Sequence, residues 1–184
     1  MDLAARPIGV FDSGVGGLSI LREIHVQLPN EDVIYVADQE WAPYGSRTLD
    51  EVRDRSVAVA AELIGRGCKA IVVACNSASA AALHYLRVVF PETPFVGMEP
   101  ALKPAAEHTD KGVIGVLATA TTFQGELYAS VLDKLANGVE VHEVAAERLA
   151  MLVEEGRFPE AKGDLEELLG PMLAAGIDTL VLGC

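Results

Sequence analysis

The sequence predicts an α/β protein made of two pseudosymmetric, doubly wound units with mainly parallel sheets. Two observations carry this prediction. Short apolar runs alternate with helix-length amphipathic stretches along the whole chain, which is typical of a doubly wound architecture. Two segments of the first half also recur in the second half at nearly the same spacing. Because ligands of open α/β sheets bind beyond the carboxyl ends of the strands, we expect the active site in a cleft between the two units.

Seven short apolar runs are predicted to be strands, and several are continuously apolar, as in a parallel sheet covered on both faces. The runs are 7–11, 33–37, 69–74, 94–98, 112–118, 139–145 and 178–183. Six stretches between them carry apolar residues at helical spacing and are predicted to be helices, at 16–28, 48–66, 77–89, 122–137, 146–155 and 160–175. Glycines stand where four of these helices are expected to end, namely Gly67, Gly138, Gly156 and Gly176.

The longer recurring segment begins with glycine and ends with cysteine in both halves. GCKAIVVAC at 67–75 aligns without a gap on GIDTLVLGC at 176–184, an offset of 109 residues. IGVFDS at 8–13 aligns on IGVLAT at 114–119, an offset of 106 residues. The two halves therefore read as related α/β units.

The passage from one unit to the other is expected between Pro94 and Pro104, where prolines interrupt the alternation of strands and helices. We therefore predict a first domain over residues 1–97 and a second domain over residues 98–184.

The composition favours a protein that handles small molecules. With 27 acidic against 14 basic residues the formal net charge is −13, and no basic cluster interrupts it, so binding to nucleic acid or to an anionic membrane is disfavoured. The N-terminal segment lacks the pattern of a signal peptide, and no apolar run approaches the roughly 20 residues of a membrane span. We expect a cytoplasmic protein.

The cysteines are expected to be free thiols. There are three, at 68, 75 and 184, without Cys-x-x-Cys spacing, so neither a disulfide framework nor a structural zinc site is indicated. The four histidines share no metal-ligand spacing with them, and no metal is expected. Free thiols in a reducing compartment are the simplest account.

Polar residues close the predicted strands, where functional residues of α/β proteins gather. They are Asp12, Ser13, Asp38, Asn76, Ser77, Thr119 and the cysteines Cys75 and Cys184. The two cysteines end equivalent strands in the two halves, so their thiols are expected to face one another across the cleft.

Opposed thiols suit the inversion of a carbon that bears a weakly acidic hydrogen, since that reaction needs a base on one face and an acid on the other. Because the reference pKa of a thiol is about 8.5, each thiolate must be favoured by its surroundings, such as a helix N-terminus and nearby donors. The alternative is that a cysteine at a strand end is only a small buried hydrophobe. We predict that structural role for Cys68, whose repeat partner is the apolar Ile177.

The glycine-rich loop DSGVGGLS allows two interpretations. Gly14 and Gly16 have dinucleotide-binding spacing, and Asp38 stands near the place of a ribose-binding acid. However, Ser19 occupies the third glycine position, and Asp12 would repel a pyrophosphate. We favour a loop whose glycines let the main chain approach a small ligand, with Asp12 beside a substrate ammonium or a catalytic thiol.

The segment APYGSR, residues 42–47, is a second candidate loop. Pro43 and Gly45 predict a sharp turn whose free N–H groups can hold a carboxylate. A plain surface turn is the alternative.

Taken in order, IGVFDSGVGGLSILREI, APYGSR, VVACNSASA, VGMEPALKPAA, IGVLATATT and LVLGC resemble the glutamate racemase family over nearly the whole chain. The resemblance implies an isomerase that interconverts L- and D-glutamate without pyridoxal phosphate, metal or another cofactor. It also implies a role in supplying D-glutamate for peptidoglycan, and hence in bacterial cell-wall biogenesis and cell shape.

The resemblance also implies roles for individual residues. Cys75 and Cys184 match the two catalytic cysteines, with Cys75 on the D-glutamate side. Asp12 matches an acid that assists the first thiol, and Glu154 matches a glutamate near the second. The positions matching substrate-binding residues are Asp12, Ser13, Tyr44, Gly45, Asn76, Ser77, Thr119 and Thr122. Ser77 stands where the family usually has threonine, a change that keeps the hydroxyl.

Family members continue past the position of Cys184 with Thr-His-Tyr-Pro and further residues that complete the first domain. We therefore expect these 184 residues to be part of a longer protein. Two alternatives to an active racemase stay open: a catalytically impaired fragment that binds glutamate, and a dinucleotide-dependent oxidoreductase. The sequence is also compatible with a homodimer, but it does not determine the oligomeric state.

Overall fold

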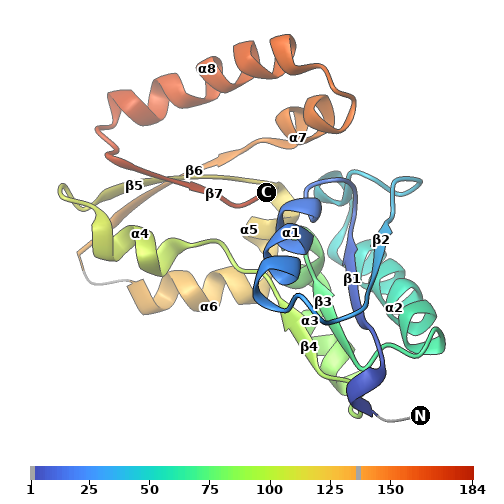
Figure 1. Cartoon of the computed structure of the whole chain (residues 1–184). Helices are drawn as coiled ribbons and strands as arrows, with labels where there is room; N and C mark the ends of the chain where they lie inside the picture. The colour runs from blue at the N-terminus through green and yellow to red at the C-terminus, as the bar shows by residue number, and fades with distance from the viewer. Residues whose placement is uncertain (1–2, 136–137) are drawn as a thin grey trace.

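The computed structural model describes residues 3–135 and 138–184. Within these ranges the chain forms two separate sheets, one from each half, and every strand pair is parallel (Figure 1). All the expected strands are present. They are β1 (Ile8–Asp12), β2 (Val33–Ala37), β3 (Ala70–Val73), β4 (Phe95–Gly97), β5 (Val113–Ala118), β6 (Glu140–Ala145) and β7 (Thr179–Leu182).

The helices largely follow the sequence prediction. They are η1 (Leu3–Ala5), α1 (Leu18–Gln27), η2 (Tyr44–Ser46), α2 (Leu49–Gly65), α3 (Asn76–Val89), α4 (Leu102–His108), α5 (Ala120–Gln124), α6 (Glu126–Leu135), α7 (Glu147–Glu154) and α8 (Phe158–Ala174). The four glycines expected near helix ends all have positive φ, which only glycine adopts without strain: Gly67 (89°), Gly138 (108°), Gly156 (71°) and Gly176 (88°). In the described part of the chain, no helix is both long enough and apolar enough to cross a bilayer.

The internal repeat is preserved in the register of the two sheets. The strand order is β2-β1-β3-β4 in the first sheet and β6-β5-β7 in the second. Ile8 pairs with Ala70 in the first sheet. Their repeat partners, Ile114 and Thr179, pair in the second sheet. Equivalent strand ends therefore lie at equivalent places, and a cysteine stands two residues beyond both β3 and β7.

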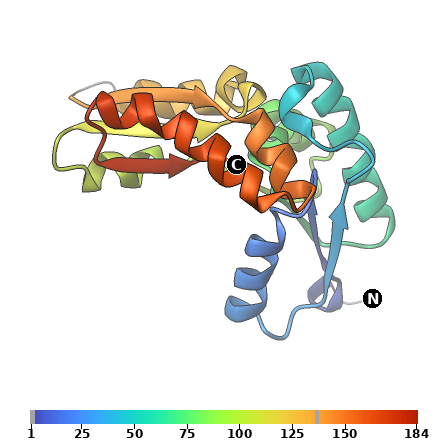
Figure 2. The same cartoon turned by 90° about the horizontal axis from the view of Figure 1, so that it is seen from above.

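The helices form layers on the sheets. Helices α7 and α8 lie on one side of the second sheet, and α4 and α6 lie on the other (Figure 1). In the first unit α1 lies on the opposite side of the sheet from α2 (Figure 2). The chain end at Cys184 lies where the two units meet in both views. This arrangement is the doubly wound architecture that the sequence predicts.

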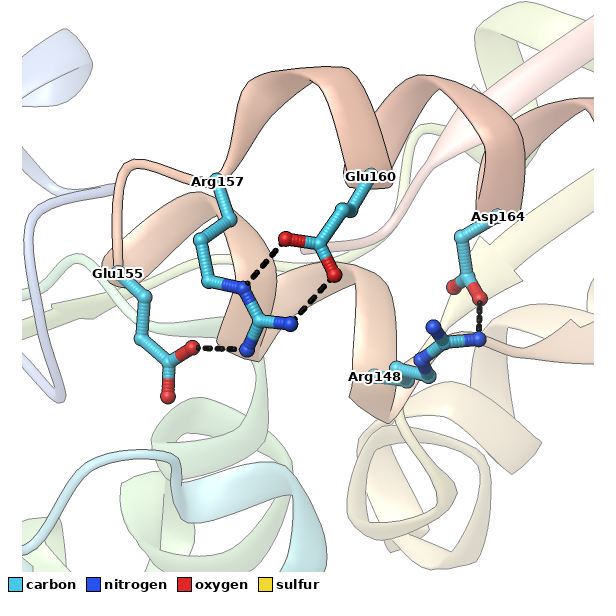
Figure 3. A network of polar contacts seen from close by, with 5 residues as sticks. All are labelled: Arg148, Glu155, Arg157, Glu160 and Asp164. Carbon is cyan, nitrogen blue, oxygen red and sulfur yellow. Dashed lines mark hydrogen bonds and ion pairs between the residues drawn. The ribbon is translucent and has the colours of Figure 1, made fainter.

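Charged side chains connect the segments around α7 and α8. Arg157 points between Glu155 and Glu160, and Arg148 points toward Asp164 (Figure 3). Nη1 of Arg157 lies 2.7 Å from Glu155, and Nη1 of Arg148 lies 2.8 Å from Asp164. Exposed pairs of this kind contribute about 1 kcal/mol at most. The buried apolar faces of the two helices therefore hold them on the sheet more than these pairs do.

Among the described residues, three apolar clusters form the core. The largest lies between the first sheet and helices α2 and α3, and it includes Phe11, Ile71 and Cys68. Cys68 is 2% exposed, so its predicted structural role is consistent with its position. Two smaller clusters lie in the second unit. The expected cover on both faces is incomplete at β7, where Leu180 is 37% exposed and Leu182 is 67% exposed.

Two helix predictions need correction. The helix expected over 122–137 is divided into α5 and α6, because the chain is extended at Gly125, where a Cβ would lie 2.4 Å from Ala80. Residues 136 and 137 of that prediction lie outside the described residues. Helix α4 was not expected, since Pro104 suggested a break. Pro104 stands in the first turn of α4, where its missing N–H has no intrahelical partner to lose.

Candidate active site

A cavity of about 290 Å³ lies between the two units, where β1, β3 and β7 end. Cavities of about 300 Å³ and above commonly hold small ligands. Of the residues expected at the site, all but Thr122 line this cavity: Asp12, Ser13, Tyr44, Gly45, Cys75, Asn76, Ser77, Thr119, Glu154 and Cys184. Both halves of the chain contribute to its walls.

Cys75 occupies the N-cap of α3. Its Sγ accepts a hydrogen bond from the N–H of Ala78 at 3.4 Å and lies 3.7 Å from Oγ of Ser13. Burial, and then the charge of Asp12, raise the pKa of Cys75 to about 12, and the bonds to Ala78 and Ser13 offset only part of this. The expectation that these surroundings favour the thiolate is therefore wrong in direction, because desolvation outweighs the helix N-terminus and the donors.

Cys184 lines the cavity from the end of β7. The residue as a whole is exposed, whereas its thiol is desolvated by its neighbours. Burial, followed by the charges of Asp12, Glu154 and Glu147, raises the pKa of Cys184 to about 11. Charge on Cys184 also raises the pKa of Cys75, so the two sulfur atoms interact through space. Ionisation of one thiol therefore disfavours ionisation of the other.

Two carboxylates close the glycine-rich loop. Asp12 accepts a hydrogen bond from the N–H of Gly14 at 2.9 Å. Glu154 lies at the end of α7 in the other unit. Its Oε1 and Oε2 both accept from the N–H of Val15, at 2.9 Å and 3.1 Å. A Cβ at Gly14 would lie 2.1 Å from Oε1 of Glu154, so a larger residue at this position would displace the Glu154 carboxylate. A pyrophosphate would need the same N–H groups beside two negative charges, which argues against the dinucleotide hypothesis.

Tyr44, in the APYGSR segment, is held from behind. Its Oη donates a hydrogen bond to Asp38 at 2.5 Å, and Arg55 donates two more to the same carboxylate at 2.6 Å and 2.5 Å. Burial alone would raise the pKa of Asp38, but the hydrogen bonds from Arg55 and Tyr44 outweigh it and lower this pKa below its usual range. Asp38 is therefore a support for Tyr44 and has no free oxygen for a ribose.

Hydroxyl groups from both units meet at the wall of the cavity. Oγ of Ser77 lies 2.8 Å from Oγ1 of Thr119, which lies 3.1 Å from Oγ1 of Thr122. Thr122 thus stands behind Thr119 and does not line the cavity. Oδ1 of Asn76 is buried without a hydrogen-bond partner among the described residues. Because a buried unpaired acceptor is unfavourable, this oxygen is suited to a ligand donor.

Several residues at the site gave no signal in the sequence. Ile20, Met98 and Leu182 line the cavity as apolar side chains, which look like any core residue in the sequence. Glu147 accepts a hydrogen bond from the N–H of Ala120 at 2.7 Å, and its charge acts on Cys184. The sequence alone does not show that Glu147 lies beside Ala120, because the two residues are more than 25 positions apart.

Fold and site together define an α/β protein of two like units that bring one thiol each to a shared cavity. Residues 8–184 match the family model described as Asp/Glu/Hydantoin racemase. The chain belongs to this family and, within it, to the glutamate racemases, which are amino-acid racemases.

The similarity extends over the whole chain. A glutamate racemase of Roseiflexus sp. is 53% identical over 185 residues, covering 100% of this chain and 68% of that protein. The structure of Escherichia coli glutamate racemase in complex with L-glutamate and the activator UDP-MurNAc-ala has a TM-score of 0.86 at 36% identity, over 97% of this chain and 69% of that one. The structure of Francisella tularensis glutamate racemase in complex with D-glutamate has a TM-score of 0.84 at 31% identity, and the match covers 98% of this chain and 69% of that one.

Proposed function

We propose that the protein interconverts L- and D-glutamate by proton transfer between two cysteines, Cys75 and Cys184. The observation that carries this proposal is the presence of one thiol from each unit, at equivalent strand ends, in the wall of a single cavity. The relatives crystallised with D- and L-glutamate support glutamate as the substrate. No step of the proposed reaction uses a cofactor.

The chemical step transfers one proton in and one proton out. From D-glutamate, the Cys75 thiolate takes the α-proton, so an S–H bond forms as the Cα–H bond breaks. The electron pair of that bond moves into the adjacent carboxylate. The Cys184 thiol then gives its proton to the opposite face of Cα and becomes the thiolate. The roles are exchanged for L-glutamate.

Formation of the first thiolate depends on the ligand. Burial and the carboxylate of Asp12 hold Cys75 as a thiol. A substrate ammonium beside Asp12 adds a positive charge near both sulfur atoms, which lowers the pKa of a thiol. Asp12 would take up the thiol proton, and its position with Cys75 in the lining of one cavity supports this role. Glu154 would act in the same way toward Cys184, whose pKa its charge also raises.

The remaining expected residues are proposed to bind the substrate. Hydroxyls of Ser13, Ser77 and Thr119, with Thr122 behind them, would donate to the carboxylates, as would the main chain of Tyr44 and Gly45. Oδ1 of Asn76 would accept from the ammonium, since it lacks a partner in the described part of the chain.

We also propose a cellular role. D-glutamate from this reaction would supply peptidoglycan synthesis. We also propose a cytoplasmic location, because the free thiols of Cys68 and Cys75 suit a reducing compartment. The division at 97/98 is supported by the position of β4, which ends at Gly97 in the first sheet. A homodimer stays a prediction.

Exchange of the α-hydrogen in D₂O tests the proposal. The wild-type chain should incorporate deuterium into both enantiomers, and Cys75→Ser or Cys184→Ser should lower racemisation by at least about 100-fold, since a serine hydroxyl is a far weaker acid than a thiol. Cys68→Ser is the control and should stay active. Binding of glutamate by the wild-type chain without any exchange would instead identify a glutamate-binding protein that is not a racemase.

A further inference from the structure

Thr121 lies next to the cavity without lining it, and the proposed reaction gives it no role. Its side chain is 1% exposed, in α5 of the second unit. Its Oγ1 lies 2.9 Å from the carbonyl oxygen of Arg47, 3.0 Å from that of Gly45 and 3.3 Å from that of Tyr44. One buried hydroxyl therefore meets three carbonyls of a segment from the other unit.

We propose that Thr121 is a positioning residue that fixes the Tyr44–Arg47 segment against the second unit and thereby sets the affinity for glutamate. This inference rests on the proposed function, because it takes the segment as a substrate-binding wall. Thr121 itself does not touch the substrate.

The segment is fixed to the first unit by its side chains. Tyr44 is bonded to Asp38, and Nε of Arg47 donates a hydrogen bond to the carbonyl of Trp41 at 2.8 Å. The guanidinium of Arg47 also lies 4.7 Å from the centre of the Trp41 ring. The side chains thus anchor the segment to the first unit, while its carbonyls turn to Thr121 in the second.

The position of this segment determines the shape of the cavity. A Cβ on Gly45 would lie 2.3 Å from Cγ2 of Thr119, so the main chain of the segment rests directly on the opposite wall. Gly45, Tyr44 and Thr119 all line the cavity. A shift of the segment away from Thr121 would therefore move Tyr44 and Gly45 relative to Thr119 and change the shape of the cavity.

Removal of the hydroxyl gives a specific expectation. Thr121→Val keeps the shape of the side chain but leaves buried carbonyls with poorer partners. The loss of one such hydrogen bond corresponds to roughly a 5-fold change in an equilibrium constant. We expect KM for D-glutamate to rise about 5-fold while kcat changes less than about 2-fold, because the thiols are untouched. Thr121→Ser, which keeps the donor, should stay within about 2-fold of the wild type.

Ser56→Ala is the matched control. Ser56 is also fully buried, and its hydroxyl donates to the carbonyl of Val52 at 2.7 Å within α2, away from the cavity. This variant should lose thermal stability without any change in KM. A merely structural role for Thr121 would give the same pattern in Thr121→Val.

Trp41 is the single tryptophan of the chain, so its fluorescence reports on the segment independently of turnover. Glutamate should change the emission of the wild type, and Thr121→Val should shift the midpoint of that titration about 5-fold. Thr121→Ala replaces Thr121→Val if the latter does not fold. If the wild type neither binds nor exchanges glutamate, the proposed function fails. If the wild type is active and the folded hydroxyl-free variant has the same KM and titration midpoint, the role of Thr121 is overturned.

Discussion

Substitution of Gly45 by alanine tests how closely the two units must approach at the cavity. The φ of Gly45 is not positive, so alanine causes no backbone strain there. The added Cβ would lie 2.3 Å from Cγ2 and 2.5 Å from Cβ of Thr119, whereas ordinary contacts begin at 3.4 Å. The main chain at Gly45 and the side chain of Thr119 must therefore separate by about 1 Å, the difference between these two distances. Thr119 cannot simply rotate away, because it is buried and bonded to Ser77 and Thr122.

Such a displacement has two measurable consequences. Overpacking costs about 1–3 kcal/mol of stability. A misplacement of roughly 1 Å in a binding wall lowers activity by about 100-fold. Racemisation of both enantiomers, followed by circular dichroism, and thermal unfolding of Gly45→Ala measure these two quantities.

Gly163→Ala is the control for the added methyl group. Gly163 lies in α8 with no atom within 4 Å of an added Cβ, so alanine should stabilise the helix by about 0.5–1 kcal/mol and leave activity unchanged. Wild-type activity together with an unchanged Tm in Gly45→Ala would refute the close approach of the two walls.

Two further predictions concern titratable groups. Asp38→Asn should lower the free energy of unfolding by about 2–4 kcal/mol at neutral pH, because Arg55 loses its buried partner. Since the pKa of Asp38 is lowered in the fold, its contribution to the free energy of unfolding is lost as pH falls below about 4. Urea unfolding of the wild type and of Asp38→Asn measures this, and a difference between them that persists unchanged in acid would contradict the prediction. Because the pKa values of Cys75 and Cys184 are raised to about 12 and about 11, both should alkylate at pH 7 at least about 100-fold more slowly than a free cysteine. Peptide mass spectrometry after iodoacetamide checks this, and fast labelling of Cys75 at pH 7 would show that its pKa is not raised.

The parts of the fold that local patterns determine could be predicted from the sequence. Most of the strands are largely apolar runs, and each glycine with positive φ at a helix end follows an amphipathic stretch. The equivalence of Cys75 and Cys184 was visible because the repeat carries the same strand and the same terminal residue in both halves. The paired registers of Ile8 and Ile114 show that this repeat is structural.

The features that depend on distant contacts could not be predicted. The break at Gly125 is associated with Ala80, 45 residues earlier, and nothing near Gly125 indicates it. The pKa of Cys75 is raised by its burial and by the charge of Asp12. The position of Cys75 at a helix N-terminus, which the sequence shows, does not reveal either effect. Asp38 looked like a ligand-binding acid because Arg55, which occupies it, lies 17 residues away in the chain.

The fate of the α-hydrogen during a single conversion tests the two-thiol account most directly. When L-glutamate is converted in D₂O, the account predicts that D-glutamate forms with solvent deuterium at Cα, while unreacted L-glutamate still carries protium in early samples. This follows because Cys184 removes the proton and Cys75, already exchanged with solvent, supplies a deuteron to the other face. D-glutamate that retains the original protium, or undiminished racemisation by Cys75→Ser, would show that a single group acts on both faces.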